Sequence, residues 1–310
     1  IYEQQATNKR RTSLVMLLFT LFVGFLGFGF DMFVLNSGFP IATLIALCIG
    51  GATAYWGLQN GARSILSSST AHLVLPDDPA YQQLRNITEE MAIASGLPVP
   101  QIYVIPDDDP NAFATGKDPQ HAVIAVTEGL VTRLNREELQ AVIAHEMSHV
   151  RNYDIRMMTV VAALIGATML LAEFGLRTMP LGRGGRRNSD RDKGGAGGIL
   201  VFVAWIIALI LAPVIAQLLG MMVSREREYL ADASGAELTR NPLALASALE
   251  KIDDAVEPTR AIKKGTAQLC IADPLGRSVN SREGAFAELL ATHPPISKRI
   301  TLLKAMAYAK

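Results

Sequence analysis

The residues best suited to chemistry in this chain form the short motif His145-Glu146-Met147-Ser148-His149. The two histidines are four positions apart, so on an α-helix both imidazoles project from one face and can bind the same metal ion. Glu146 follows His145 by about 100° around the helix and can reach a water molecule on that metal. The chain has only five histidines, so an accidental match to this pattern is rare. The motif predicts a zinc site with His145 and His149 as ligands and Glu146 as general base.

A catalytic zinc site needs a third protein ligand and an open position for water. The longer motif that adds a histidine six residues after the second one is excluded, since Asn152 and Ile155 occupy the positions of its glycine and histidine. Residues 224–232 are the better source, because Glu228 and Asp232 lie four apart on one helical face. We predict that Glu228 is the third ligand. Asp232 would hold a ligand imidazole through its second ring nitrogen.

Other acidic residues compete with this assignment. Glu226 and Glu237 are rival ligands, although Glu226 points to a different face of the helix from Glu228. Alternating charge of this kind is also typical of a helix that is simply exposed to solvent. Asp154 lies one position away from the histidine of the longer motif, and we interpret it as a surface or helix-end residue.

The elements that carry these residues are mostly helical. The His145 motif lies on a helix predicted to begin at the N-cap Asn135 and to run through Val150. Residues 78–95 show apolar spacing near 3.6, and Gly96 ends that helix. Three short strands are predicted between them, at residues 101–105, 112–115 and 122–126. The fold class predicted for the soluble parts is therefore mostly α with a small β-sheet.

Long apolar runs predict an integral membrane protein. Residues 12–30, 32–62 and 194–224 carry no charged side chain, and crossing a bilayer takes about 20 apolar residues. Residues 157–176 are a weaker candidate because Glu173 interrupts them. Buried core helices are the alternative interpretation, and they are easiest to defend for this weaker run. We predict about four transmembrane helices.

Basic residues beside the apolar runs predict the orientation in the membrane. Lys9, Arg10 and Arg11 favour a cytoplasmic N-terminus. The first run is long for a cleaved signal peptide and has no clear small-residue cleavage site, so we interpret it as a retained anchor. The basic loop at residues 177–198 disagrees with a simple four-span count. Either the rule is broken there or the last two segments do not fully cross.

The composition of the chain and the order of its segments predict its domain organisation. The chain has 29 Lys+Arg and 29 Asp+Glu, and this zero net charge excludes nucleic-acid binding by bulk charge. Residues 1–62 form the predicted N-terminal membrane anchor, and 63–156 a catalytic part with the metal motif. Residues 157–224 form a membrane hairpin with an Arg/Gly-rich loop, and 225–310 a second catalytic part that supplies the third ligand.

These motifs resemble those of the HtpX-type membrane zinc metalloproteases, which are related to the CAAX prenyl endopeptidases. The resemblance runs from the first membrane segment to the C-terminus, with residues 145–149 and 224–232 in the family's order. Residues 110–116 resemble the family's active-site edge strand. His293-Pro294-Pro295, followed by Arg299, resembles its C-terminal His-Pro motif. Four spans favour the HtpX branch, since the prenyl proteases have more.

The resemblance implies a zincin-like catalytic domain that binds one Zn²⁺ per chain and hydrolyses peptide bonds. Glu146 would be the base, and His293 or Arg299 would help zinc to stabilise the oxyanion of the tetrahedral intermediate. The edge strand would bind an extended substrate through main-chain hydrogen bonds. The substrate-binding residues predicted in this way are Asn111, Ala112, Phe113 and Ala114.

The resemblance also implies the setting. The protease would lie in the bacterial inner membrane, with its site on the cytoplasmic side, and would degrade misfolded or damaged membrane proteins under stress. Both ligand helices are expected to continue into apolar segments, since His149 precedes residue 157 by about 12 Å of helix. A processing protease with one defined client and a membrane scaffold without turnover are the alternatives. Glu146 argues against the scaffold, which needs no base.

Overall fold

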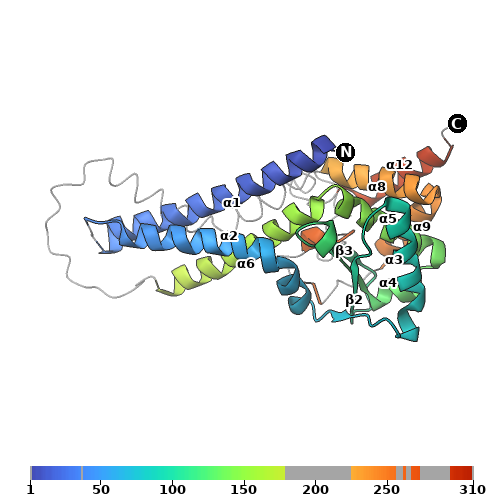
Figure 1. Cartoon of the computed structure of the whole chain (residues 1–310), viewed down its shortest axis with the longest axis horizontal. Coiled ribbons are helices and arrows are strands. Elements are labelled where there is room, and N and C mark those ends of the chain that lie inside the picture. Colours follow the sequence, from blue (N-terminus) through green and yellow to red (C-terminus); the bar gives the residue numbers. More distant parts are fainter. Residues whose placement is uncertain are drawn as a thin grey trace.

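The structure is a computed structural model of the chain, and it describes residues 2–35, 38–178, 225–255, 261–262, 267–272 and 294–308. Figure 1 shows two parts: a bundle of long helices on one side, and a compact part with the sheet and the shorter helices on the other. The bundle consists of α1 (Tyr2–Phe30), α2 (Ile41–Ser68) and α6 (Asp154–Thr178), with the short π-helix η1 (Asp31–Leu35) after α1. The predicted fold class, mostly helical with a small sheet, is confirmed.

Two helices in the described ranges are long and apolar enough to cross a membrane. They are Gln5–Phe30 within α1 and Ile41–Ser68, with mean hydropathies of 2.3 and 1.7. Both carry many large apolar side chains on the outside, as helices do that face lipid. These exposed side chains include Leu14, Leu17, Leu21, Phe28, Leu44, Ile45, Ile49 and Trp56. Of the other two predicted spans, residues 157–176 lie within α6, and residues 194–224 fall outside the described part of the chain.

Small residues let the helices of the bundle approach closely. A Cβ atom at Gly61 of α2 would lie 2.8 Å from Cγ2 of Thr159 on α6, and one at Gly57 would lie 3.0 Å from Cβ of Ala163. Helices in membranes commonly pack through such small residues, because lipid supplies no hydrophobic force between them. This contact fixes α6 against α2 near the compact part, where α6 begins.

The sheet has four strands in the order β1-β2-β4-β3. Strand β2 is parallel to β4, whereas the β1–β2 and β3–β4 pairs are antiparallel, so β3 lies at an edge. The bounds are β1 (His72–Leu73), β2 (Gln101–Ile105), β3 (Ala112–Thr115) and β4 (Val123–Thr127). The predicted strands differ from these by at most one residue at each end, and β1 was missed because two residues carry no periodicity.

The compact part is built around α5 (Arg136–Arg151), which packs against α3, α6, α8, α9 and β3. The other helices are α3 (Gln82–Ser95), α4 (Glu128–Arg133), α8 (Arg225–Thr239), α9 (Pro242–Asp253) and α12 (Ile296–Tyr308), with short 3-10 turns η2 (Pro79–Tyr81), η3 (Pro119–His121) and η4 (Ala267–Leu269). The start of α5 is as predicted: Oδ1 of Asn135 accepts from the Glu138 main-chain N–H, and Glu138 accepts from that of Asn135, both at 2.9 Å.

The end of α5 lies within one residue of the predicted end at Val150, but the expected continuation of the helix into an apolar segment is wrong. The helix stops at Arg151 and does not continue into the apolar run. Asn152 and Tyr153 form a turn, with Tyr153 at φ 59°, and α6 begins anew at Asp154. No glycine or proline lies here to predict the break between the two helices. The break depends on a left-handed conformation at a non-glycine residue. The turn brings the first residue of α6 back towards His149.

Candidate metal centre

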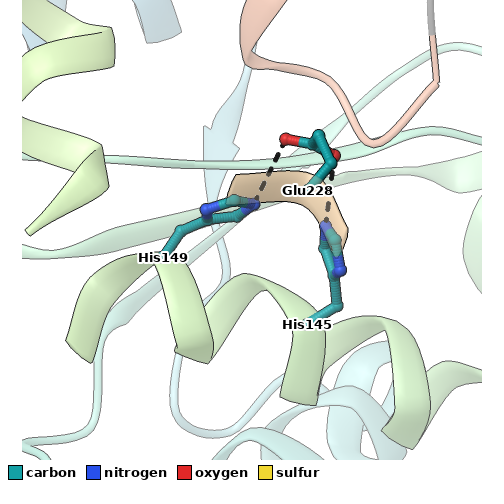
Figure 2. A group of neighbouring side chains, drawn as sticks. All are labelled: His145, His149 and Glu228. Carbon is teal, nitrogen blue, oxygen red and sulfur yellow. Dashed lines mark ion pairs between the residues drawn. The ribbon is translucent and has the colours of Figure 1, made fainter. Parts of the chain in front are cut away.

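Figure 2 shows His145 and His149 on α5 facing Glu228 on α8. One ligand atom from each residue lies within 4.8 Å of the other two. The Nε2 atom of His145 is 3.8 Å from Oε2 of Glu228, and Nε2 of His149 is 3.6 Å from its Oε1. The two imidazole rings are nearly perpendicular, at 86°. The three residues predicted as ligands are therefore brought together, although 79 positions separate His149 from Glu228 in the sequence.

Close packing of α8 on α5 allows Glu228 to approach the two histidines. Glu228, Asp232 and Gly235 follow one another at spacings of four and three, so they share one face of α8. A Cβ atom at Gly235 would lie 3.0 Å from the main-chain nitrogen of His145 and 3.2 Å from its Cα. Glycine is unfavourable inside a helix, and here it lets the two backbones approach. Gly235 was not among the predicted site residues, although a glycine in the middle of a helix is a signal of close packing.

Asp232 and Arg299 support the His145 imidazole. The Nδ1 atom of His145 lies 3.0 Å from Oδ1 of Asp232. The guanidinium of Arg299 donates to both carboxylate oxygens of Asp232, at 2.7 and 2.8 Å, and approaches Oε2 of Glu228 at 3.5 Å. Burial would raise the pKa of Asp232, but the Arg299 charge and the hydrogen bonds lower it below its ordinary value. A buried, ionised carboxylate thus faces the ring nitrogen opposite the ligand atom.

Asp154 supports the His149 imidazole in the same way. Its Oδ2 lies 3.1 Å from Nδ1 of His149, and its Oδ1 accepts from Arg227 at 3.2 Å and from Asn8 at 2.8 Å. Burial alone would lower the pKa of His149, but the bond to Asp154 and the charge of Glu228 raise it to about 9. Asp154 does begin a helix, but its interpretation as a surface residue was wrong. It is 2% exposed, because the turn after α5 folds it inwards.

The buried groups at this site fit a metal ion. The Nε2 atom of His145 is buried and has no hydrogen-bond partner among the described residues. Two imidazole nitrogens and one carboxylate are a donor set found in catalytic zinc sites. Glu146 is also buried, and this desolvation raises its pKa, although the two histidines act in the opposite direction. A cation would compensate the buried negative charge.

The rival ligands and the remaining predicted residues lie elsewhere. Glu226 and Glu237 are on α8 with exposed side chains, and the structure does not bring them to the cluster. His293 lies outside the described residues. The role of Arg299 as an oxyanion donor stays a prediction, and its contacts are those given above.

The predicted edge strand does lie at the edge of the sheet, but its outer side is partly occupied. The main-chain N–H of Ile271 donates to the carbonyl of Ala112 at 2.9 Å, and Nδ2 of Asn111 donates to the carbonyl of Ala272 at 3.1 Å. Phe113 forms an antiparallel bridge with Cys270. Substrate binding by residues 111–114 stays a prediction, and a substrate strand would have to displace residues 270–272 or pair beyond them.

Comparison with known proteins identifies the family. A sequence profile described as Peptidase family M48 matches residues 80–307, which is most of the chain. The chain belongs to peptidase family M48. A protein named Protease HtpX homolog from Caldanaerobacter subterraneus subsp. tengcongensis is 44% identical over 307 residues, covering 99% of this chain and 98% of that one. Another Protease HtpX homolog, from Ligilactobacillus salivarius, is 41% identical over 306 residues, covering 99% and 100%.

Membership of family M48 makes the chain a metalloprotease, a metal-dependent hydrolase of the HtpX type. Among solved structures, the crystal structure of S. mikatae Ste24p matches with a TM-score of 0.49 and 18% identity, covering 97% of this chain and 64% of that one. The predicted recognition and enzyme class are confirmed, and the cluster of His145, His149 and Glu228 lies inside the matched residues.

Proposed function

We propose that this M48 protein is a membrane-bound zinc endopeptidase with one Zn²⁺ per chain, held by His145, His149 and Glu228. It would cleave misfolded or damaged membrane proteins as part of quality control under stress. The observation that carries the proposal is the buried cluster of two imidazoles and one carboxylate, with a further carboxylate, Glu146, one residue after the first histidine. A site of this kind has the ligands and the base that peptide hydrolysis requires.

The residues would divide the chemistry as follows. A bound Zn²⁺ would act as a Lewis acid on the scissile carbonyl and lower the pKa of water towards about 7. Glu146 would accept a proton from the attacking water and deliver it to the leaving amine, and its buried position makes its carboxylate more basic. Arg299 is bound to Asp232 and to the carbonyl of Ile271, so we assign it to positioning. His293 then stays the proposed donor to the oxyanion.

The membrane setting is part of the proposal. The start of α1 contacts the first residue of α6, and both helices become apolar within two turns of that contact. This supports a site close to the membrane surface, with membrane proteins or their loops as substrates. The basic residues before the first span favour a cytoplasmic site in a bacterial inner membrane. An extended substrate would pair with the outer side of β3 after displacing residues 270–272, or would pair beyond them.

The test replaces Glu146 by Gln, which keeps its size and removes the base. We expect zinc content to stay near one per chain, while kcat on an unfolded probe such as casein, or on a destabilised membrane protein, falls by about 10²–10⁴-fold. Zinc is measured by elemental analysis of the detergent-purified protein, and a chelator should abolish wild-type cleavage. Equal cleavage by Glu146→Gln would refute the catalytic assignment.

The third ligand needs its own comparison. Glu228→Ala should lose zinc and activity together, whereas Glu226→Ala, two positions away on the same helix and exposed, should keep both. Zinc retained by Glu228→Ala and lost by Glu226→Ala would reverse the assignment. A client assay with several unrelated membrane proteins tests the substrate class, since cleavage of one client alone would indicate a processing protease.

A further inference from the structure

The first turns of helix α1 contact residues 151–154, which lie next to the candidate metal centre. Asn8 lies in these polar first turns, before the apolar run that starts at residue 12, and its side chain is buried. The amide Nδ2 of Asn8 donates to Oδ1 of Asp154 at 2.8 Å and to the main-chain carbonyl of Asn152 at 2.9 Å. The other oxygen of Asp154 faces His149. Asn8 is thus connected to a proposed metal ligand through a single carboxylate.

The contact restricts how Asp154 can orient. A carboxylate accepts hydrogen bonds in several directions, so one oxygen faces a chosen partner reliably only when the other oxygen is held. Asn8 and Arg227 both donate to Oδ1, which leaves Oδ2 for Nδ1 of His149. This arrangement directs Nε2 of His149 towards Glu228. Partners of this kind determine the orientation and basicity of metal-binding histidines.

The same turns of α1 also hold the turn that delivers Asp154. Nε2 of Gln5 donates to the carbonyl of Arg151, the last residue of α5, at 2.9 Å. The ammonium group of Lys9 lies 4.2 Å from the centre of the Tyr153 ring. Tyr153 adopts the left-handed conformation that non-glycine residues rarely adopt, so the turn needs support from neighbours.

We propose that Asn8 is a positioning residue of the metal centre, which acts through Asp154 to hold His149 in the orientation of a ligand. The first membrane helix would then be part of the site as well as an anchor. The inference rests on the proposed function, because it takes His149 to be a zinc ligand. It assigns to α1 a role that is independent of the lipid around it.

The test measures zinc affinity of the full-length protein in detergent, by competition with a chromogenic chelator. The measurement uses a Glu146→Gln background, in which the proposed protease is inactive and cannot degrade the sample. Asn8→Ala should lower the affinity by about tenfold, at the small end of the range for residues that orient metal ligands. Ser13→Ala is the control: it also removes a side-chain donor from α1, but Ser13 is exposed and donates to the main-chain carbonyl of Lys9, away from Asp154 and its turn, so this variant should bind zinc as the parent does.

A double-mutant cycle shows whether the effect passes through the carboxylate. Asp154→Ala alone should lower zinc affinity by up to about 100-fold. Adding Asn8→Ala should then cause no further loss, because its partner is gone. With Glu146 intact, Asn8→Ala should lower kcat and leave KM unchanged, which mere loss of helix docking does not predict.

Two outcomes would overturn the inference: additive losses of zinc affinity in the cycle, or an Asn8→Ala protein that binds zinc as tightly as Ser13→Ala. If Asn8→Ala does not fold, Asn8→Ser, which keeps a shorter hydroxyl donor, is measured against the same criteria. Failure of the proposed function has a different signature. The parent protein itself would bind no zinc, and the inference would fall with it.

Discussion

The two histidines of the metal centre are supported by two similar arrangements from different parts of the molecule. Each imidazole presents Nδ1 to a buried aspartate, and each aspartate is bound by a buried arginine. Behind His145 stand Asp232 of α8 and Arg299 of α12, both in the compact part. Behind His149 stands Asp154, the first residue of the bundle helix α6, with Asn8 of α1 as a second donor.

The difference between the two arrangements shows how the site is connected to the bundle of long helices. The His145 side lies wholly within the compact part, where Arg299 donates two hydrogen bonds to Asp232 and a third to a main-chain carbonyl. The His149 side connects the compact part, which holds His149, with the long helices α1 and α6, which hold Asn8 and Asp154. Displacement of these helices would therefore alter His149 before it alters His145.

Replacing the two arginines should have unequal effects, and this is the largest difference we expect. Arg299→Ala leaves Asp232 buried without its bidentate partner and should lower the free energy of unfolding by about 3–5 kcal/mol. Arg227→Ala should cost about 1–3 kcal/mol, because Asp154 keeps the bond from Asn8. Urea unfolding of the metal-free proteins in detergent, followed by circular dichroism, measures both.

Arg299→Lys serves as the control for charge alone. A lysine cannot donate in the paired geometry that Asp232 accepts, so it should recover little of the loss. If Arg299→Ala and Arg227→Ala lowered the free energy of unfolding equally, or if Arg299→Lys were as stable as the parent, the two arrangements behind His145 and His149 would not differ as described.

A methyl group at Gly235 should disturb the His145 side by another route. Alanine is the better helix former by about 1 kcal/mol, so an isolated helix would gain from Gly235→Ala. In the protein the new Cβ would press on the main chain of His145 at 3.0 Å, and α8 would have to move away with Glu228 and Asp232. We expect about tenfold weaker zinc binding, comparable to the loss of an orienting residue.

Ser234→Ala, at the neighbouring position of α8, is the control for that substitution, and it should keep the zinc affinity of the parent. Unchanged zinc binding by Gly235→Ala would show that the spacing between α5 and α8 tolerates an extra methyl group. The ligand geometry would then depend on the aspartates alone.

The two arrangements were not equally predictable from the sequence, and the reason is again the different places that they occupy in the fold. Glu228 and Asp232 share a regular helix, so the spacing of four predicted their common face and their roles as a pair. Asp154 follows a turn whose left-handed residue, Tyr153, has no sequence signature, and its position cannot be obtained from helical periodicity. Both ends of α5 were predicted within one residue, from the N-cap Asn135 to Val150, whereas the turn that follows the helix was not.

Contacts between distant segments were the least predictable. Nothing in the polar start of α1 singles out Asn8, because its partner is 146 positions away and one of many acidic residues. The edge strand was predicted at residues 112–115, but its contact with Ile271 depends on where an irregular segment folds back. Local sequence patterns predicted the helices, the strands and the residue types that would bind the metal. The residues that contact the two histidines from behind depend on tertiary packing, which these patterns do not give.

The smallest predicted effect separates stability from metal binding. Glu138, at the start of α5 and far along the helix from His149, accepts hydrogen bonds from Ser247 and Lys251, each at 2.7 Å, as well as from the Asn135 main chain. Glu138→Ala should lower the free energy of unfolding by about 1–3 kcal/mol at pH 7. Zinc affinity should stay that of the parent, because α5 keeps its packing around the ligands.

The pH dependence of that loss follows from the pKa of Glu138. Burial would raise this pKa, but the hydrogen bonds from Lys251, Asn135 and Ser247 lower it below the ordinary value of 4.5. Its stabilising contribution is therefore present in full above about pH 4.5 and is lost as the pH falls through the lower folded-state value. The difference in the free energy of unfolding between the metal-free parent and Glu138→Ala should be constant from pH 5 to 8 and shrink below pH 5.

Glu137→Ala, at the exposed neighbouring position, is the control, and it should change the free energy of unfolding by no more than about 0.5 kcal/mol at any pH. A parallel fall in zinc affinity for Glu138→Ala would mean that any loosening of α5 weakens the site, and the separate roles given to the two aspartates would lose their support.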